Sequence, residues 1–179
     1  ITPNESELFG IYAPPAISSP RSSDESALLH KMQDVSDFYE VPCVVCTRGA
    51  QGIVALLDYG RKKVTYPARS RQVFDVTGAG DTVTAGIAAY IATYADPSLP
   101  RPPAGADPAA VRDVWLKTVT SDAIDFANAA AGLVVEVPGT TVVDWGQVRS
   151  AQRDWELASK IINPERIAEV VVEHQRGKD

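Results

Sequence analysis

Apolar residues recur at helical spacing along much of the chain. Leu28, Met32 and Val35 fall on one side of a helix over residues 24–39, and Asp24 is placed to cap its first turn. The same spacing and cap signals predict helices at residues 79–94, from Asp107 towards Thr118, from Ser121 through Val135, at residues 144–159 with Asp144 and Gln147 as a capping box, and from Asn163 onward.

Between these helices lie shorter runs with strand character. Residues 41–47 are almost continuously apolar and predict a buried strand directly after the first long helix, which makes an α/β unit. Residues 52–57, 63–66 and 72–76 are short β-rich runs separated by turn residues. They predict hairpins that lead into a glycine-rich turn.

The two cysteines, Cys43 and Cys46, have the spacing of a Cys-x-x-Cys pair but lie inside the predicted buried strand. Side chains three positions apart on a strand point to opposite faces, so these thiols are expected neither to pair nor to share a metal ion. The whole chain has two Cys and two His, which makes a structural zinc site unexpected.

The composition is that of an ordinary globular domain. The 179 residues are 45% hydrophobic and 22% charged, which is enough for one sizeable core. A net charge of -6 argues against a general nucleic-acid or anionic-membrane surface. No apolar run approaches ~20 residues, so a cytoplasmic protein is expected. Because the chain begins at Ile1, we also expect that the native N-terminus lies upstream.

The glycine-rich turn, Asp-Val-Thr-Gly-Ala-Gly-Asp at residues 75–81, carries the clearest chemistry. Gly78 and Gly80 let the backbone turn, so that the amides of Gly78, Ala79 and Gly80 can face one anion at the start of the following helix. Asp81 can then accept a proton from a substrate hydroxyl while the amides hold the charge of a transferring phosphoryl group. The alternative is a plain turn whose Gly and Asp serve only as turn and cap residues.

This turn resembles the second signature of the ribokinase-like (PfkB-type) sugar kinases, in which Asp-x-Thr-Gly-Ala-Gly-Asp precedes a helix of small residues. The resemblance extends over nearly the whole chain but covers only the later half of the family's domain. It implies the later half of a three-layer α/β/α sandwich, with a mostly parallel sheet and short antiparallel edge strands. The earlier half, which supplies most sugar contacts in the family, has no counterpart here.

Two further elements resemble the family's ATP site. Thr47, Arg48, Gly49 and Gly52 belong to a Thr-x-Gly-x-x-Gly at the end of the buried strand, which is similar to the nucleotide phosphate loop. Asn128 stands where the family places a residue beside the adenine and ribose. Without the resemblance, a β-turn and an interior helix packed through alanines explain these residues equally well.

The resemblance also implies metal sites. Asn4 and Glu7 form an Asn-x-x-Glu that is similar to the element organising Mg²⁺ and its waters, and oxygen donors suit Mg²⁺. Taken alone, Asn4 and Glu7 are a helix cap and its box partner. A monovalent cation such as K⁺ would be held by a pair of loops, which correspond here to Asp75, Thr77 and the backbone of Val134, Val137 and Gly139. Val143 stands where the family often has Ser, which departs from the potassium pattern.

Within the family, residues 73–83, 126–135 and 139–142 are most similar to kinases that phosphorylate D-glycero-β-D-manno-heptose 7-phosphate at its anomeric position. In bacteria that kinase is often fused to a nucleotidyltransferase. The resemblance therefore implies a kinase half-domain at residues 1–160 and, at residues 161–179, a helix leading to such a module, whether fused or separate. It implies ATP and a small sugar or sugar phosphate as partners, and it leaves a homodimer open.

Other functions remain open from the sequence. The chain could be a truncated, non-catalytic piece that binds nucleotide, or a ribokinase-like kinase for another sugar or nucleoside. A dinucleotide-binding oxidoreductase is disfavoured, because Gly78-Ala-Gly80 lacks the third glycine at the required spacing and no acidic residue ends a following strand.

Overall fold

The computed structural model describes residues 1–14, 25–70, 72–94, 105, 107, 109 and 120–161. The chain separates into two compact units, Ile1–Val142 and Val143–Asp179. The first unit contains a sheet and the helices around it, and the described part of the second is the helix α6 (Trp145–Ile161). The expected boundary between residues 160 and 161 stays a prediction.

A three-stranded antiparallel sheet is the centre of the first unit. Its strands are β1 (Cys43–Thr47), β2 (Ile53–Leu57) and β3 (Lys62–Tyr66), in the order β1-β2-β3. All five residues of β2 are buried, as expected for a central strand covered on both faces. The short connections between consecutive strands require the antiparallel pairing, because a parallel neighbour needs a long crossover.

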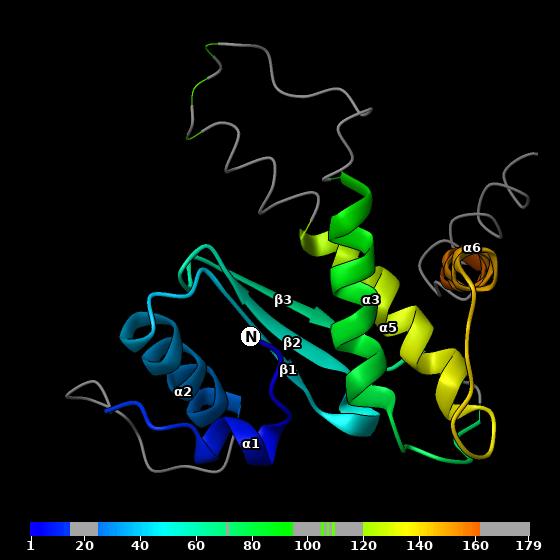
Figure 1. Ribbon diagram of the computed structural model, residues 1–179, viewed down its shortest axis with the longest axis horizontal. Coiled ribbons are helices and arrows are strands. Elements are labelled where there is room, and N and C mark those ends of the chain that lie inside the picture. The colour runs from blue at the N-terminus through cyan, green and yellow to red at the C-terminus, as the bar shows by residue number, and fades with distance from the viewer. Residues whose placement is uncertain are drawn as a thin grey trace, which may run out of the picture. The chain divides into compact units, whose positions relative to one another are not determined.

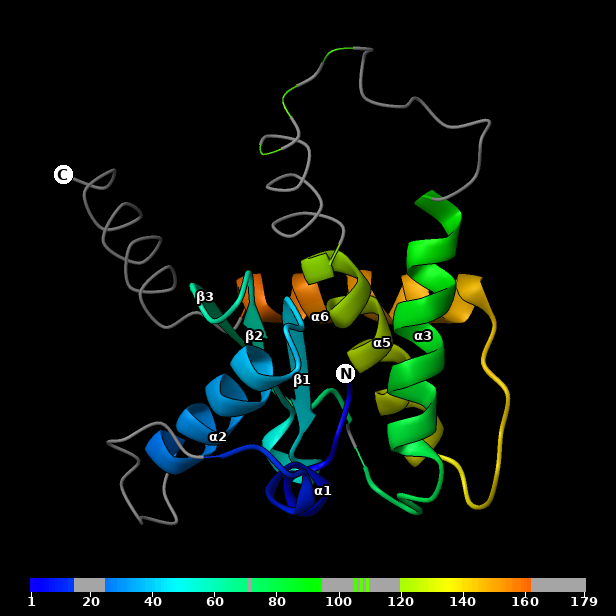
Figure 2. The same ribbon diagram turned by 60° about the vertical axis from the view of Figure 1, so that its left-hand side comes forward.

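The first residues of the chain extend this sheet along the free edge of β1. The Val45 amide donates to the Ile1 carbonyl at 2.9 Å, and the Thr47 amide donates to the Pro3 carbonyl at 3.0 Å. Asn4 forms a parallel bridge with Thr47. Figure 2 shows the N-terminal residues beside β1. A mostly parallel sheet was expected, but among the described residues parallel pairing is confined to this edge, where α1 and α2 supply the crossover.

Helices cover both faces of the sheet and give three layers (Figure 1). α1 (Glu5–Gly10) and α2 (Glu25–Phe38) cover one face, and α3 (Ala79–Tyr94) and α5 (Thr120–Val135) cover the other. The first core contains Leu8, Leu28, Met32, Val35, Val44, Cys46, Val54 and Leu56. The second contains Val45, Ile53, Ala55, Leu57, Tyr66, Val83, Ile124 and Ala127. Successive residues of β1 and β2 thus enter different cores, because side chains alternate between the two faces of a strand. A sheet with helices on both faces is the predicted α/β class.

The two cysteines lie on opposite faces of β1, as predicted. Cys46 belongs to the core under α1 and α2, whereas Cys43 packs against the core under α3 and α5. Both are free thiols. Burial raises the pKa of both, that of Cys46 to about 11, so neither is disposed to form a thiolate at neutral pH.

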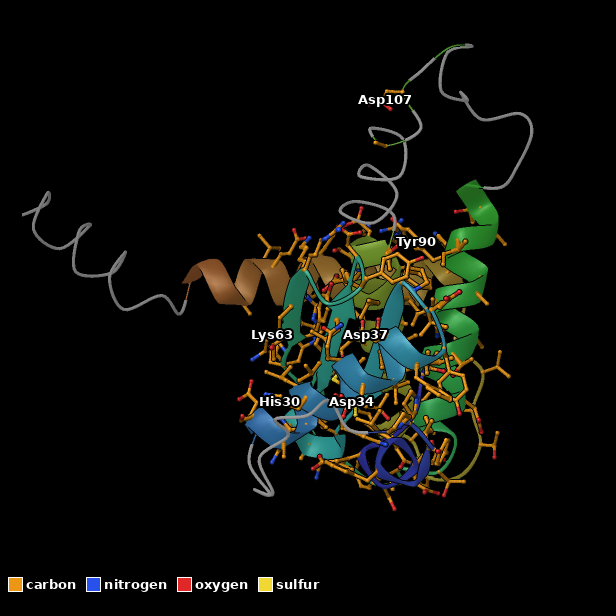
Figure 3. All side chains as sticks on the ribbon, turned by 90° about the vertical axis from the view of Figure 1, so that its left-hand side faces the viewer. His30, Asp34, Asp37, Lys63, Tyr90 and Asp107 are labelled. Carbon is orange, nitrogen blue, oxygen red and sulfur yellow. The ribbon has the colours of Figure 1, made fainter. Side chains whose placement is uncertain are left out.

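Close packing of α3 on α5 fixes the two helices that carry the glycine turn and Asn128. A Cβ added at Gly86 would lie 3.0 Å from both the Cα and the Cβ of Ala127, so the backbones approach each other there. Further along, the rings of Tyr90 (labelled in Figure 3) and Phe126 have centroids 5.4 Å apart.

The predicted helices at residues 24–39, 79–94, 121–135 and 144–159 correspond to α2, α3, α5 and α6. The capping box before α6 is confirmed. The Gln147 amide donates to Asp144 Oδ1 at 2.9 Å, and the Asp144 amide donates to Gln147 Oε1 at 2.8 Å. The Asp24 cap and the helix after Asn163 lie outside the described residues. Of the helix predicted from Asp107 towards Thr118, only residues 107 and 109 are described, and the Ala109 amide donates to Asp107 Oδ1 at 3.0 Å.

The predicted strand at residues 72–76 is wrong. The amides of Phe74 and Asp75 both donate to the carbonyl of Val135, at 2.8 and 3.3 Å, at the last turn of α5. The segment therefore satisfies its backbone at a helix end and not in the sheet. Across the ranges that the structure describes, no helix has both the length and the apolar character needed to cross a membrane.

Candidate active site

A pocket of about 350 Å³ opens in the first unit, beyond the end of β1 and beside the start of α3. It is lined by Asn4, Thr47, Gly49, Ala50, Gly52, Ile53, Ala68, Arg69, Ser70, Val73, Val76, Ala79, Gly80, Val83, Asn128, Ala131, Gly132 and Val135. The lining thus draws on four of the segments singled out in the sequence, near residues 4, 47–52, 79–80 and 128. These segments are far apart in the chain and meet only in the fold.

Other predicted site residues lie outside the lining of this pocket. They are Glu7, Arg48, Asp75, Thr77, Gly78, Asp81, Val134, Val137 and Gly139. Several of them still contact residues that form its wall, as described below.

The loop after β1 turns sharply into the short helix η1 (Gly49–Gln51). Gly52 has φ +84°, and a Cβ there would lie 2.1 Å from the carbonyl oxygen of Tyr66, so only glycine fits. The Arg48 amide closes the loop by donating to the Gly52 carbonyl at 2.8 Å. Arg48 Nε donates to Glu5 Oε2 at 3.1 Å, which directs the guanidinium to α1.

Asn4 and Glu7 form the capping box of α1. The Glu7 amide donates to Asn4 Oδ1 at 2.8 Å, and the Asn4 amide donates to Glu7 Oε2 at 2.9 Å. The cap interpretation is therefore confirmed. It does not exclude a second role for Asn4, which also lines the pocket and lies beside Thr47.

The glycine turn brings the first turn of α3 to the pocket. Gly78 has φ +78°, and its carbonyl accepts from the Thr82 amide at 2.9 Å and from Thr82 Oγ1 at 2.8 Å. The Ala79 amide donates to the Val76 carbonyl at 3.2 Å, so it is already engaged. Ala79 and Gly80 border the pocket at the positive end of the helix, where an anion is favoured.

Asp81 follows Gly80 in the first turn of α3 and is exposed. It does not line the pocket itself. Its chain neighbour Gly80 does line the pocket, so this exposed carboxylate is one residue away from the lining. The arrangement is consistent with one ligand in the pocket and a partner hydroxyl outside it.

Asp75 ties the glycine turn to the loop after α5. Its Oδ1 accepts from the Thr77 amide at 2.9 Å, and its Oδ2 accepts from the Gly139 amide at 3.2 Å. Hydrogen bonds from Thr77, and then from Gly139, lower the pKa of this carboxyl group. In the second loop the carbonyl of Val134 accepts from the Val137 amide at 3.2 Å.

Asn128 is buried in α5 with an exposed fraction of 5%. Its Nδ2 donates to the carbonyl of Pro67 at 2.9 Å, so the side chain holds the segment after β3. Next to it, Ala131, Gly132 and Val135 present small or apolar groups to the pocket. This wall can accept a flat, largely apolar group.

The segment at residues 67–70 is the part of the site that the sequence did not reveal. Ala68, Arg69 and Ser70 line the pocket next to α5. In the sequence they form a proline-led turn between two β-rich runs, a pattern that predicts only a connection. The signal that could have exposed them is Gly132, whose missing side chain makes room for this segment.

The fold and the pocket define a ribokinase-like α/β protein, with its candidate site at the end of a strand and the start of a helix. Residues 1–145 match the model of the pfkB family carbohydrate kinases, and the chain belongs to that family. The bifunctional protein HldE of Pseudomonas aeruginosa strain UCBPP-PA14 is 35% identical over 151 residues, which are 84% of this chain and 25% of that protein. The chain thus spans about a quarter of the length of this relative.

Solved structures show the same fold. The ribokinase of Arabidopsis thaliana, complexed with ribose and ATP, is 24% identical with a TM-score of 0.54, over 84% of this chain and 39% of that one. Phosphofructokinase-2 of Escherichia coli, in complex with potassium, is 14% identical with a TM-score of 0.57, over 85% of this chain and 39% of that one.

Proposed function

We propose that the chain supplies the nucleotide site and the catalytic base of an ATP-dependent carbohydrate kinase. The observation that carries this proposal is the pocket, because its lining combines the loop after β1, the start of α3 and the Asn128 region of α5. The loop after β1 and the Asn128 region resemble parts of the family's ATP site, and the start of α3 resembles the family's second signature. Membership of the pfkB family supports the class of reaction.

ATP would lie with its base against the wall formed by Ala131, Gly132 and Val135, and with its phosphates towards Gly49 and Gly80. The apolar wall suits a planar base. The loop amides after β1 and the positive end of α3 suit the phosphates. The similar Arabidopsis ribokinase was solved with ATP, which supports a nucleotide as the ligand.

Asp81 would act as the base. Its carboxylate accepts the proton of a sugar hydroxyl as that oxygen bonds to the γ-phosphorus, and the bond from this phosphorus to the bridging oxygen breaks to release ADP. The amides of Gly78, Ala79 and Gly80 would hold the charge on the transferring group, and the Ala79 amide would have to give up its bond to the Val76 carbonyl. The exposure of Asp81 beside the pocket supports this division of roles.

The residues near the phosphates also fit Mg²⁺. Asn4 and Glu7 offer an amide and a carboxylate oxygen, the donors that this ion prefers. Because each already takes part in the α1 capping box, they would hold Mg²⁺ through its waters. The ion, when bound to ATP, would neutralise phosphate charge.

A monovalent cation would be held where Asp75 joins the turn at Thr77 to the loop at Gly139. The hydrogen bonds between these loops support a shared site. The similar phosphofructokinase-2 was solved with potassium, which supports K⁺ as the ion.

For the sugar, the proposal is a heptose 7-phosphate that is phosphorylated at its anomeric hydroxyl. The similarity to the bifunctional protein HldE supports this choice. On the same resemblance, a nucleotidyltransferase module would accompany the kinase, either fused beyond residues 161–179 or as a separate chain.

A second candidate is a nucleotide-binding piece that transfers no phosphate. It is favoured because this chain covers only 39% of the Arabidopsis ribokinase chain and 39% of the Escherichia coli phosphofructokinase-2 chain. A phosphate-transfer assay with γ-labelled ATP and a panel of sugars, including heptose 7-phosphate, together with calorimetry of ATP·Mg²⁺ binding, separates the two candidates. Labelled sugar phosphate supports the kinase, binding without transfer supports the second candidate, and the absence of binding overturns both.

A further inference from the structure

One face of α5 grips the segment at residues 67–70, which we call the 67–70 wall. Asp125, Asn128 and Gly132 are spaced three and four residues apart and therefore lie on one side of the helix. Each of them meets a different atom of this segment. The contacts are thus arranged along the helix as three successive points of attachment.

Two of the attachments involve backbone carbonyls. Asn128 Nδ2 donates to the Pro67 carbonyl at 2.9 Å. At Gly132 the Arg69 carbonyl oxygen occupies the side-chain position, since a Cβ there would lie 1.5 Å from it. These contacts bring the wall against α5, but they leave the Arg69 side chain to be fixed separately.

The third attachment is an ion pair between Arg69 and Asp125. Arg69 Nη2 lies 2.7 Å from Asp125 Oδ1, and Arg69 Nη1 donates to Asp125 Oδ2 at 3.0 Å. This two-point geometry defines the plane of the guanidinium group as well as its position. The two side chains are 17% and 27% exposed, so the pair is better shielded from water than a typical surface pair.

We infer that Arg69 and Asp125 are a positioning pair that holds the 67–70 wall against α5 and thereby sets the affinity of the pocket for its nucleotide. The inference rests on the proposed function for the identity of the ligand. Arg69, Ala68 and Ser70 line the pocket beside Asn128, which also lines it. Release of the ion pair would let this wall move and would widen the space that the nucleotide has to fill.

The first test asks whether the pair holds the wall. Asp125→Asn keeps the size of the side chain and removes its charge, so Arg69 should become accessible to trypsin. Cleavage after Arg69 should then be faster than in the wild-type chain. The matched control is Asp58→Asn, because Asp58 pairs with Arg61 at 3.5 Å on the β2–β3 turn, away from the pocket lining. This control should leave cleavage after Arg69 unchanged.

The second test asks whether the pair sets affinity. Calorimetry with ATP·Mg²⁺ should give a Kd about tenfold weaker for Asp125→Asn, as expected when two contacting charged residues are uncoupled. The charge-swapped chain, Arg69→Asp with Asp125→Arg, should recover most of this loss. The titrations are done well below the Tm of every variant, so that each chain is folded. Under this condition a pair that only stabilises the fold would lower Tm and leave Kd unchanged.

Faster cleavage after Arg69, together with a weaker Kd that the charge swap recovers, supports the inference. Unchanged cleavage overturns it, and so does a lower Tm with an unchanged Kd. If the wild-type chain binds no ATP·Mg²⁺, the proposed function fails. Faster cleavage would then identify a structural clamp, and the inference about affinity would be overturned.

Discussion

Asp75 Oδ2 accepts a hydrogen bond from the Gly139 amide at 3.2 Å, across 64 positions of sequence. The same carboxylate accepts from the Thr77 amide within its own turn. One side chain therefore couples the glycine turn before α3 to the loop after α5. The glycine turn leads into the first turn of α3, where the proposed phosphoryl transfer would take place.

Asp75→Ala should lower Tm in a pH-dependent way. The folded state lowers the pKa of Asp75, so its stabilising effect is present above the unfolded-state pKa and is lost as pH falls through the folded value. The difference in Tm between wild type and variant should be largest near neutral pH and vanish in strong acid. Thermal unfolding from neutral to acidic pH measures it, with the exposed Asp154→Ala on α6 as control. A difference that stays constant with pH would contradict the assignment.

Gly132→Ala should destabilise the chain and weaken nucleotide binding. A new methyl group would meet the Arg69 carbonyl, and a backbone group cannot move aside cheaply. Overpacking of this kind costs roughly 1–3 kcal/mol, which offsets the ~1 kcal/mol that Ala gains over Gly in a helix. Chemical denaturation and ATP calorimetry give the two readouts.

Gly10→Ala is the control for this change. No atom lies within 4 Å of the Cβ position at Gly10, which is the last residue of α1, so the free energy of unfolding should stay at the wild-type value or rise by up to about 1 kcal/mol. An equal loss of stability in both variants would show that the contact with Arg69 is not the cause.

Asp81→Asn should abolish most phosphate transfer and leave ATP binding intact. The amide cannot accept the hydroxyl proton, and general-base catalysis is worth about 10²–10⁴-fold in rate. Because Asp81 does not line the pocket, Kd for ATP·Mg²⁺ should change by less than about twofold, since a tenfold change needs 1.4 kcal/mol. Wild type and variant are compared in the form of the protein for which sugar phosphorylation has been detected. Normal turnover in the variant would rule out Asp81 as the base.

The order of the helices and strands follows from the sequence because each element carries its own apolar period. The spacing of Leu28, Met32 and Val35 predicts α2, and all three side chains are buried in one core. Residues 72–76 show the limit of such reasoning. They have strand composition, but the Val135 carbonyl at the end of α5 offered their amides a partner that no local pattern reveals.

The candidate site was predictable to a similar extent. Gly80, Thr47 and Asn128 stand in motifs with recognisable chemistry, and all three line the pocket. The partner of Asn128 was not predictable, because Pro67 lies 61 positions away and the hydrogen bond exists only in the folded chain. The pairing of Arg69 with Asp125 is hidden for the same reason.

The most direct test of the central claim is a titration of ATP·Mg²⁺ into the isotopically labelled chain, followed by backbone amide NMR. The account predicts saturable binding. The largest chemical-shift changes should occur at the amides of four glycines that line the pocket, Gly49, Gly52, Gly80 and Gly132. Saturable binding with shifts confined to other regions, or no binding at all, would contradict it.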